Sequence, residues 1–176
     1  LPNPMLKRKI LDSCFFATIS EYNRSYLIQS CGPAVLPKIR LIRCGLPLAT
    51  LPYQTHQASP TGGQPVRILS VGRLVDYKGF DILIRAVARM RARGVAVRCR
   101  IVGDGPQRAR LDHLIGELNL AGSVALVGSL LQEEVTKEMR DSDLFVLACR
   151  TADDGQQDGI PIVLMEAMAL GVPVVS

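Results

Sequence analysis

The sequence predicts an α/β fold built on a doubly wound parallel sheet, and two observations carry that prediction. From Val66 onward, apolar runs typical of buried strands alternate with segments of helical periodicity. Strand–helix units of this length favour parallel strands joined by right-handed crossovers. Ligands bind such sheets at the carboxyl ends of the strands, near the point where the strand order reverses. We therefore expect the site to lie in the loops 72–79, 103–106, 128–132 and 149–161.

Five strands and four helices are expected in this part of the chain. The first helix has apolar residues at 80, 83, 84, 87 and 90, and Gly94 ends it. The last helix is almost wholly apolar, which predicts that it is buried. The fifth strand has barely begun at Ser176, so the sheet looks unfinished. The expected strands are 66–74, 95–102, 122–130, 143–149 and 172–176, and the expected helices are 80–94, 107–120, 132–142 and 160–171.

The chain divides into three parts on this interpretation. Residues 1–48 are the tail of a preceding domain, with a short strand, a helix that starts near Ser20 or Glu21, and a second strand. Residues 49–65 are rich in Pro, Gly, Ser and Thr, which is typical of a linker. Residues 66–176 are the α/β domain. The first residues make a poor signal peptide and look like a segment cut from a longer protein.

Composition excludes several classes of protein. No window offers about 18 uninterrupted apolar residues, so no membrane span is predicted. The cysteines are odd in number, scattered, and never spaced as CxxC, which disfavours a disulfide framework and a zinc site. We therefore expect reduced thiols and a cytoplasmic protein. The five cysteines are Cys14, Cys31, Cys44, Cys99 and Cys149.

The charges are divided unevenly along the chain. Lys and Arg outnumber Asp and Glu by seven to two in residues 1–49 and by eleven to three in 50–110, whereas 111–176 has three against eleven. A nucleic-acid interface would stay basic throughout its domain, so none is predicted. A basic half that faces an acidic half fits a cleft for an anion and a polyhydroxy group. For most single charges the alternative is a solvated helix face.

Two cations follow the first strand of the domain. Arg73 comes directly after it, and Lys78 lies five residues later, just before a helix. A guanidinium fork, an ammonium group and the free amides of a helix start together suit a diphosphate. The alternative is that both cations face water, and the loop is not a Walker A motif. Gly103 and Gly105 give only part of a dinucleotide-binding pattern, so a tight turn is the default there.

Two acids stand in the apolar stretch that closes the sequence. Asp158 lies at the entry of the last predicted helix, where the amides of Ile162 and Val163 are free to donate. Pro161 suits the first turn, because its missing N–H would be unpaired anyway. Asp158 could therefore be a simple N-cap. Glu166 has apolar neighbours, so it needs a partner: a ligand, an arginine, or a polar edge of the helix.

The sequence gives little support for a metal site or for a histidine that acts as a general base. Asp153 and Asp154 could hold a divalent ion, but an exposed acidic loop is favoured. His56 falls in the linker and His113 on an exposed helix pattern, so surface positions are expected for both. Four arginines, at 85, 89, 91 and 93, could contact anionic lipid headgroups, and a solvated face is the alternative.

Five ordered stretches resemble the family 4 retaining glycosyltransferases of GT-B fold, of the bacterial exopolysaccharide and lipopolysaccharide type. They read SVGRLVDYKGFDILIRA, IVGDGP, SVALVGSL, DSDLFVLAC and DGIPIVLMEAMALGVPVVS. The likeness covers 66–176, and more loosely 17–27 and 39–51. It implies that 66–176 is the nucleotide-sugar domain, the C-terminal Rossmann-like half of the fold.

The resemblance also implies a site. The family's motif of two glutamates with seven residues between them reads here as Asp158 and Glu166. Asp158 would contact the donor sugar and Glu166 the ribose, while Arg73 and Lys78 would hold the diphosphate and stabilise the leaving charge. Asp158, Arg73 and Lys78 are thus the implied catalytic residues. The other implied donor-binding residues are Gly103, Gly105, Ser129, Leu130, Gly159, Ile160, Pro161, Ile162 and Val163.

The implied reaction moves a sugar, with retention, from a UDP- or GDP-sugar to a glycan or lipid-linked acceptor in surface polysaccharide synthesis. No metal or other cofactor is implied, and the full-length enzyme would be cytoplasmic, with peripheral attachment to the inner membrane face. Asp158 shortens the family's first acid by one methylene, and the acceptor-binding domain is missing. We therefore expect the chain alone to bind nucleotide weakly and to transfer no sugar.

Two other functions remain open on the sequence. One is a non-catalytic nucleotide-binding or scaffold module, in which Asp158 marks lost activity. The other is a different GT-B enzyme, such as a nucleotide-sugar epimerase or a phosphorylase, although these would not be expected to carry the paired motifs around Lys78 and Glu166. A dinucleotide oxidoreductase is disfavoured, because GxGxxG is absent.

Overall fold

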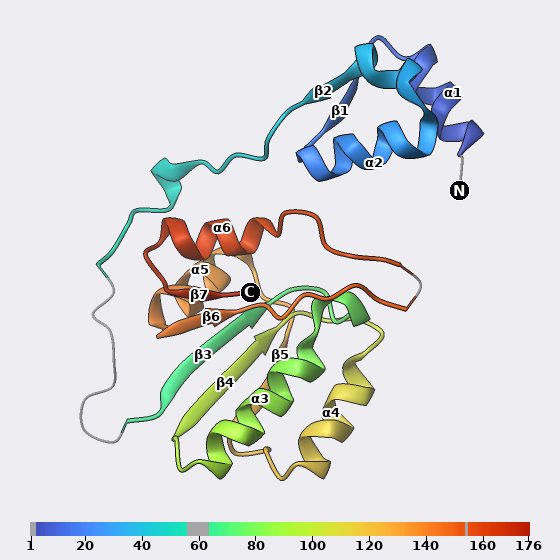
Figure 1. Cartoon of the computed structure of the whole chain (residues 1–176). Helices are drawn as coiled ribbons and strands as arrows, with labels where there is room; N and C mark the ends of the chain where they lie inside the picture. The colour runs from blue at the N-terminus through green and yellow to red at the C-terminus, as the bar shows by residue number, and fades with distance from the viewer. Residues whose placement is uncertain (1–2, 56–63, 154) are drawn as a thin grey trace. The chain divides into compact units, whose positions relative to one another are not determined.

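The computed structural model describes residues 3–55, 64–153 and 155–176 (Figure 1). They belong to two compact units, Leu1–Leu46 and Pro47–Ser176. The linker predicted over 49–65 stays a prediction, because its central residues 56–63, His56 among them, lie outside the described part. Asp154 also lies outside it.

The first unit is a small α/β element. Helix α1 (Pro4–Asp12) precedes strand β1 (Phe16–Thr18), helix α2 (Glu21–Cys31), the 3-10 helix η1 (Pro33–Lys38) and strand β2 (Ile39–Leu41). The two strands pair in parallel. Ser20 caps α2, since its hydroxyl accepts from the Asn23 amide at 3.1 Å, as predicted. The core consists of Ile10, Leu27, Cys31, Val35 and Ile39.

Helix α1 was not predicted. The structure supplies the start signal: the Asn3 side chain accepts from the Leu6 amide at 3.0 Å, and Pro4 occupies the first helical position. Ile10 alone is buried on this helix.

The second unit contains the predicted sheet. It has five strands in the order β5-β4-β3-β6-β7, and every pair is parallel. The prediction of a doubly wound parallel sheet is confirmed. The strands are β3 (Val66–Val71), β4 (Val97–Val102), β5 (Val124–Gly128), β6 (Leu144–Val146) and β7 (Val174–Val175).

Helices cover both faces of this sheet. Helices α3 and α4 lie on one face, and α5 and α6 on the other (Figure 1). Each of the first two buries an apolar stripe with helical spacing, including Phe80 and Ile84 on α3 and Leu111 and Leu114 on α4. The helices are α3 (Phe80–Ala92), α4 (Arg108–Glu117), α5 (Gln132–Asp141) and α6 (Ile162–Ala169), with short 3-10 helices η2 (Leu48–Thr50) and η3 (Asp76–Lys78).

Helix α6 departs from its prediction. It was expected to be buried, but only Ala167 is buried within it, and Ile162 and Met168 are 47% and 59% exposed. Its start also differs: Pro161 is the N-cap rather than a first-turn residue, and Asp158 lies outside the helix. The apolar composition of α6 did not show whether one face of the helix or the whole helix is buried. Within the described residues, no helix combines the length and apolar character needed to cross a membrane.

The strand order places a switch point between β3 and β6. From β3 the chain continues outward through β4 and β5, then returns to β6 on the other side of β3. The two loops that leave these central strands therefore meet at one edge of the sheet. Their approach is close: Gly79 has φ +65°, and a Cβ there would lie 1.8 Å from the Ala148 carbonyl oxygen. Only glycine fits this position.

Candidate functional site

A cavity of about 570 Å³ opens at the carboxyl ends of the central strands, at the switch point. Its wall is formed by strand ends, the loop that precedes α5 and the first half of α6. The lining residues are Val71, Gly72, Lys78, Val102, Gly103, Ser129, Leu130, Gln132, Val135, Asp158, Ile160, Pro161, Ile162, Val163 and Glu166.

Lys78 and Asp158 form an ion pair on this wall. Lys78 ends η3 in the loop after β3, whereas Asp158 lies in the long segment between β6 and α6. The two side chains are only 13% and 20% exposed. They come from opposite sides of the switch point, so the fold rather than local sequence brings them together. A partly buried ammonium group with a single carboxylate partner can still donate to an incoming anion.

Cys149 adds a second contact to the same carboxylate. Its thiol donates to Asp158 Oδ2 at 3.3 Å, so one oxygen of Asp158 accepts from both Lys78 and Cys149. Burial, followed by the hydrogen bond to Asp158, raises the pKa of the Cys149 thiol to about 11. Cys149 is thus a protonated donor at neutral pH, and not a nucleophile.

Alkylation checks this protonation state. At pH 8 we expect iodoacetamide to modify Cys149 about 100-fold more slowly than in the urea-unfolded chain, because the thiolate fraction is smaller. The folded-state rate should keep rising about tenfold per pH unit through pH 10, where the unfolded thiol has levelled off. Peptide mass spectrometry resolves this site from Cys14, which is exposed. Similar rates in the folded and unfolded chains would contradict the assignment.

Glu166 lies on the cavity wall, half-buried, with one side-chain partner in the described structure. Gln132, the first residue of α5, donates from Nε2 to Glu166 Oε1 at 3.1 Å. The sequence left open a ligand, an arginine or a polar edge of the helix as the partner of Glu166. The partner in the structure is a polar side chain at the edge of the helix, that of Gln132. Neither Gln132 nor Cys149 was predicted. A glutamine at a helix start and a cysteine after a strand have no motif that marks them.

Ten of the thirteen residues predicted for the site line the cavity. The other three are Arg73, Gly105 and Gly159. Arg73 is exposed, and the buried residue beside it is Leu74. Gly105 packs against the backbone of Leu74, where an added Cβ would lie 2.6 Å from the carbonyl oxygen. The cation that the structure brings to the wall is therefore Lys78.

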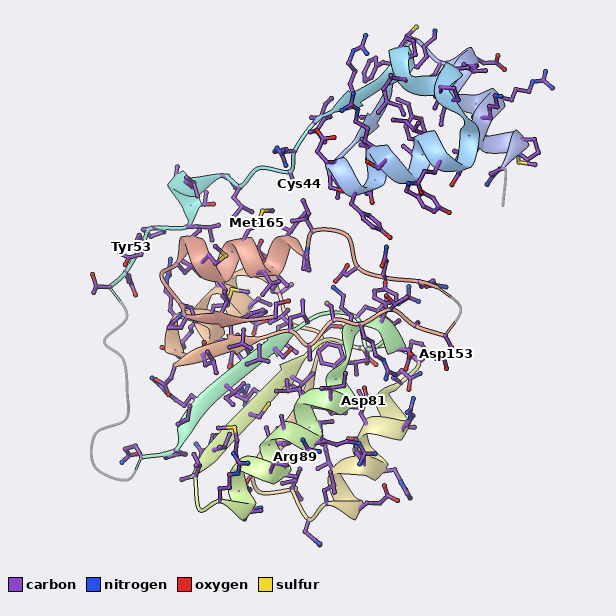
Figure 2. The ribbon with its side chains drawn as sticks, in the orientation of Figure 1. Cys44, Tyr53, Asp81, Arg89, Asp153 and Met165 are labelled. Atoms are coloured by element: carbon purple, nitrogen blue, oxygen red, sulfur yellow. The ribbon has the colours of Figure 1, made fainter. Side chains whose placement is uncertain are left out.

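The remaining candidates lie elsewhere. Asp153 is exposed in the loop between β6 and α6 (Figure 2). His113 is exposed on α4, with Nδ1 3.6 Å from Glu117. Among the described residues, no group of three or more His, Cys, Asp or Glu side chains could hold a metal ion.

Known proteins match this chain over most of its length. The family Glycosyl transferases group 1 matches residues 54–176. The chain is 40% identical over 148 residues to the "Putative colanic acid biosynthesis glycosyltransferase WcaL" of Salmonella typhimurium, covering 84% of the chain and 35% of the relative. It is 31% identical over 177 residues to a GDP-mannose-dependent mannosyltransferase of Mycolicibacterium smegmatis, covering 97% of the chain and 46% of the relative. The chain thus spans less than half the length of these relatives.

Solved structures share the fold. The sucrose-phosphate synthase of Thermosynechococcus elongatus superposes with a TM-score of 0.77 at 26% identity, covering 96% of this chain and 42% of the other. Anabaena Alr3699/HepE, solved in complex with UDP and glucose, superposes with a TM-score of 0.72 at 20% identity, covering 98% and 48%. The fold agrees with the family match, which covers well over half of the chain. The chain belongs to the glycosyl transferases group 1 family.

Proposed function

We propose that this chain forms the nucleotide-sugar site of a retaining glycosyltransferase that makes surface polysaccharide. The observation that supports this proposal is that Lys78, Asp158 and Glu166 line one cavity at the switch point. The donor would be a nucleoside-diphosphate sugar, and the acceptor a glycan or a lipid-linked sugar.

Lys78 would bind the diphosphate. Its ammonium group is now paired with Asp158, and a diphosphate would bring further negative charge to the same cation. As the bond from sugar to phosphate breaks, negative charge grows on the diphosphate and positive charge on the sugar ring. A fixed ammonium group stabilises the first and a carboxylate the second. The first amides of α6, at Ile162 and Val163, lie on the same wall and would add donors for the phosphates.

Glu166 and Gln132 would bind the nucleoside. Ribose hydroxyls can donate to the carboxylate of Glu166, while its contact with Gln132 keeps that carboxylate in place. Ser129 and Leu130 line the cavity beside them and would lie near the base. In this scheme the residues do the chemistry without a metal, and the exposed Arg73 would reach the diphosphate only by turning inward.

The names of relatives support this proposal. They include enzymes of colanic acid and amylovoran biosynthesis and a GDP-mannose-dependent mannosyltransferase. Structures of the same fold hold UDP with glucose or GlcNAc. All five cysteines are free, which supports a reducing compartment, the cytoplasm. Arg85, Arg89 and Arg91 lie exposed on α3, and Arg93 lies exposed at its C-cap. These arginines, of which Figure 2 labels Arg89, would face anionic lipid if the enzyme attaches to a membrane.

Nucleotide titration tests the proposed site. We expect calorimetry to show that UDP or GDP binds the chain more tightly than the matching monophosphate, because only the diphosphate reaches Lys78. Lys78→Gln should abolish that preference, whereas Glu166→Gln should weaken the binding of the diphosphate and of the monophosphate to a similar extent. Equal affinity of wild-type and Lys78→Gln proteins for the diphosphate, or no binding by the full-length protein, would overturn the proposal.

Asp158→Glu separates an adapted site from a decayed one. The present carboxylate contacts both Lys78 and Cys149 with one oxygen, and an added methylene displaces it from that position. We therefore expect the full-length enzyme to lose about tenfold in kcat/KM with this variant, although it restores the family's residue. A large gain in turnover would instead support the non-catalytic alternative, in which Asp158 marks lost activity.

A further inference from the structure

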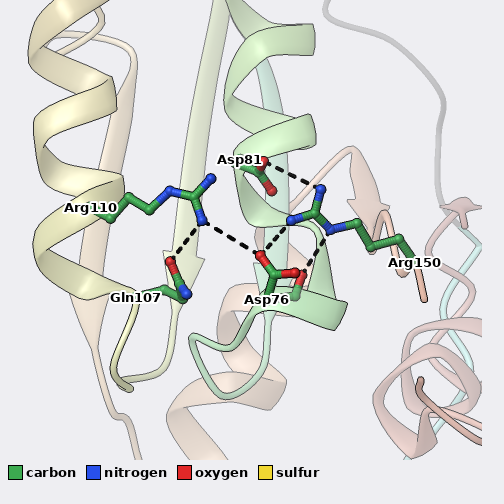
Figure 3. A network of polar contacts seen from close by, with 5 residues as sticks. All are labelled: Asp76, Asp81, Gln107, Arg110 and Arg150. Carbon is green, nitrogen blue, oxygen red and sulfur yellow. Dashed lines mark hydrogen bonds and ion pairs between the residues drawn. The ribbon is translucent and has the colours of Figure 1, made fainter. Parts of the chain in front are cut away.

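A network of ion pairs contacts the turn that leads to Lys78 on the cavity wall. Its centre is Arg150, which follows Cys149 in the chain (Figure 3). The Arg150 guanidinium donates to the Asp76 carboxylate, and its Nε lies 3.3 Å from the Asp76 carbonyl oxygen. A further guanidinium nitrogen lies 3.8 Å from Asp81. Arg110 approaches Asp76 from the other side at 3.6 Å and donates to Gln107 at 3.2 Å.

These contacts hold the backbone turn that ends at Lys78. The Arg150 amide donates to the Tyr77 carbonyl oxygen at 2.9 Å, so Arg150 binds the carbonyl groups of two successive residues before Lys78. Within the turn, the Lys78 amide donates to Val75 and the Gly79 amide to Asp76. Two residues of the turn, Asp76 and Tyr77, are thus bound from the segment after β6.

The charges of this network are paired with one another, and Arg150 does not contribute to the cavity wall. Arg150 is paired with two carboxylates, and the hydrogen bond to Asp76 raises the pKa of its guanidinium above the ordinary value. Arg150 is not among the residues that line the cavity. Lys78, two residues beyond Asp76, is the cation on the wall. The arginine is therefore placed to act on the turn and not on a ligand.

We propose that Arg150 is a positioning residue for Lys78. By holding the carboxylate and the carbonyl group of Asp76 across the switch point, its guanidinium fixes the turn that presents the Lys78 ammonium group to Asp158 and to the donor diphosphate. The dipeptide Cys149–Arg150 then supports both members of the ion pair, the thiol through Asp158 and the guanidinium through the turn. The effect on the donor rests on the proposed function, whereas the effect on Lys78 does not.

A double-mutant cycle tests the inference. We expect Arg150→Met to weaken UDP or GDP binding about tenfold, and to have no further effect in a Lys78→Gln background. Arg150→Lys should recover only part of the affinity, because an ammonium group cannot reproduce the planar fork. The matched control is Arg100→Met, which removes a two-bond pair with Glu138 away from the cavity. It should change affinity by less than about twofold.

A ligand-free measurement separates this inference from the proposed function. Reductive ¹³C-methylation labels the five lysines of the chain, and Lys78→Arg identifies the Lys78 signal. We expect Arg150→Met to shift that signal in the absence of nucleotide, and Arg100→Met to leave it in place. If the signal shifts but no nucleotide binds wild-type protein, the proposed function fails and the positioning role stands. An unmoved signal, or an equal loss of affinity with and without Lys78, overturns the positioning role.

Discussion

Replacing Lys78 with alanine is expected to lower kcat/KM for the nucleotide sugar between about 100-fold and 1,000-fold in the full-length enzyme. The reason is that Lys78 is the cation on the cavity wall, so the departing diphosphate would lose its fixed counter-charge. The side chain is 13% exposed, and water replaces such a partner poorly. Steady-state kinetics with UDP- and GDP-sugars measure the effect.

Lys137→Ala is the matched control for this change. It removes an exposed ammonium group from α5, on the same domain but away from the lining residues. Its kcat/KM should stay within about twofold of the wild-type value. The unfolding free energy of Lys78→Ala must be measured alongside, because in the described structure the change leaves Asp158 with the Cys149 thiol as its remaining side-chain partner. An active, stable Lys78→Ala enzyme would rule out the proposed role.

Gly79→Ala is expected to give the largest loss of stability, about 3 kcal/mol or more in the free energy of unfolding. The added Cβ would lie 1.8 Å from the carbonyl oxygen of Ala148, so the start of α3 and the segment after β6 would have to separate. That movement would also pull Lys78 away from Asp158. Urea unfolding followed by circular dichroism measures the change.

Gly94→Ala isolates the cause of that loss. Gly94 also has a positive φ, +80°, but an added Cβ there meets nothing within 4 Å. Its substitution should cost only the strain of the left-handed conformation, about 1 kcal/mol. The difference between the two variants measures the close approach at the switch point. Equal losses would mean that the contact with Ala148 has no energetic weight.

The order of strands and helices in the second unit could be predicted because each element repeats its own pattern locally. The apolar stripe of α3 and the buried run of β3 both identify their elements without knowledge of partners. The loops around the site followed from topology alone, because parallel strands gather their carboxyl ends at one edge.

The partners within the site could not be predicted in this way. Arg73 and Lys78 are cations in one loop, and the sequence does not say which of them turns to the cavity. The answer depends on the η3 turn, which Arg150 holds from 74 residues away. The same holds for Gln132 and Cys149. Gln132 reaches Glu166 because α5 and α6 lie on the same face of the sheet, and Cys149 reaches Asp158 because of the path of the segment between β6 and α6.

The strand order has a consequence for when this site comes into existence. Lys78 and Asp158 are 80 positions apart, and they meet only after the returning strand β6 has docked beside β3. A partly folded chain with β3, β4 and β5 alone would carry the ammonium group without its counter-charge. On the proposed function, nucleotide binding would therefore require the finished sheet, and a bound nucleotide would stabilise both halves of it against unfolding together.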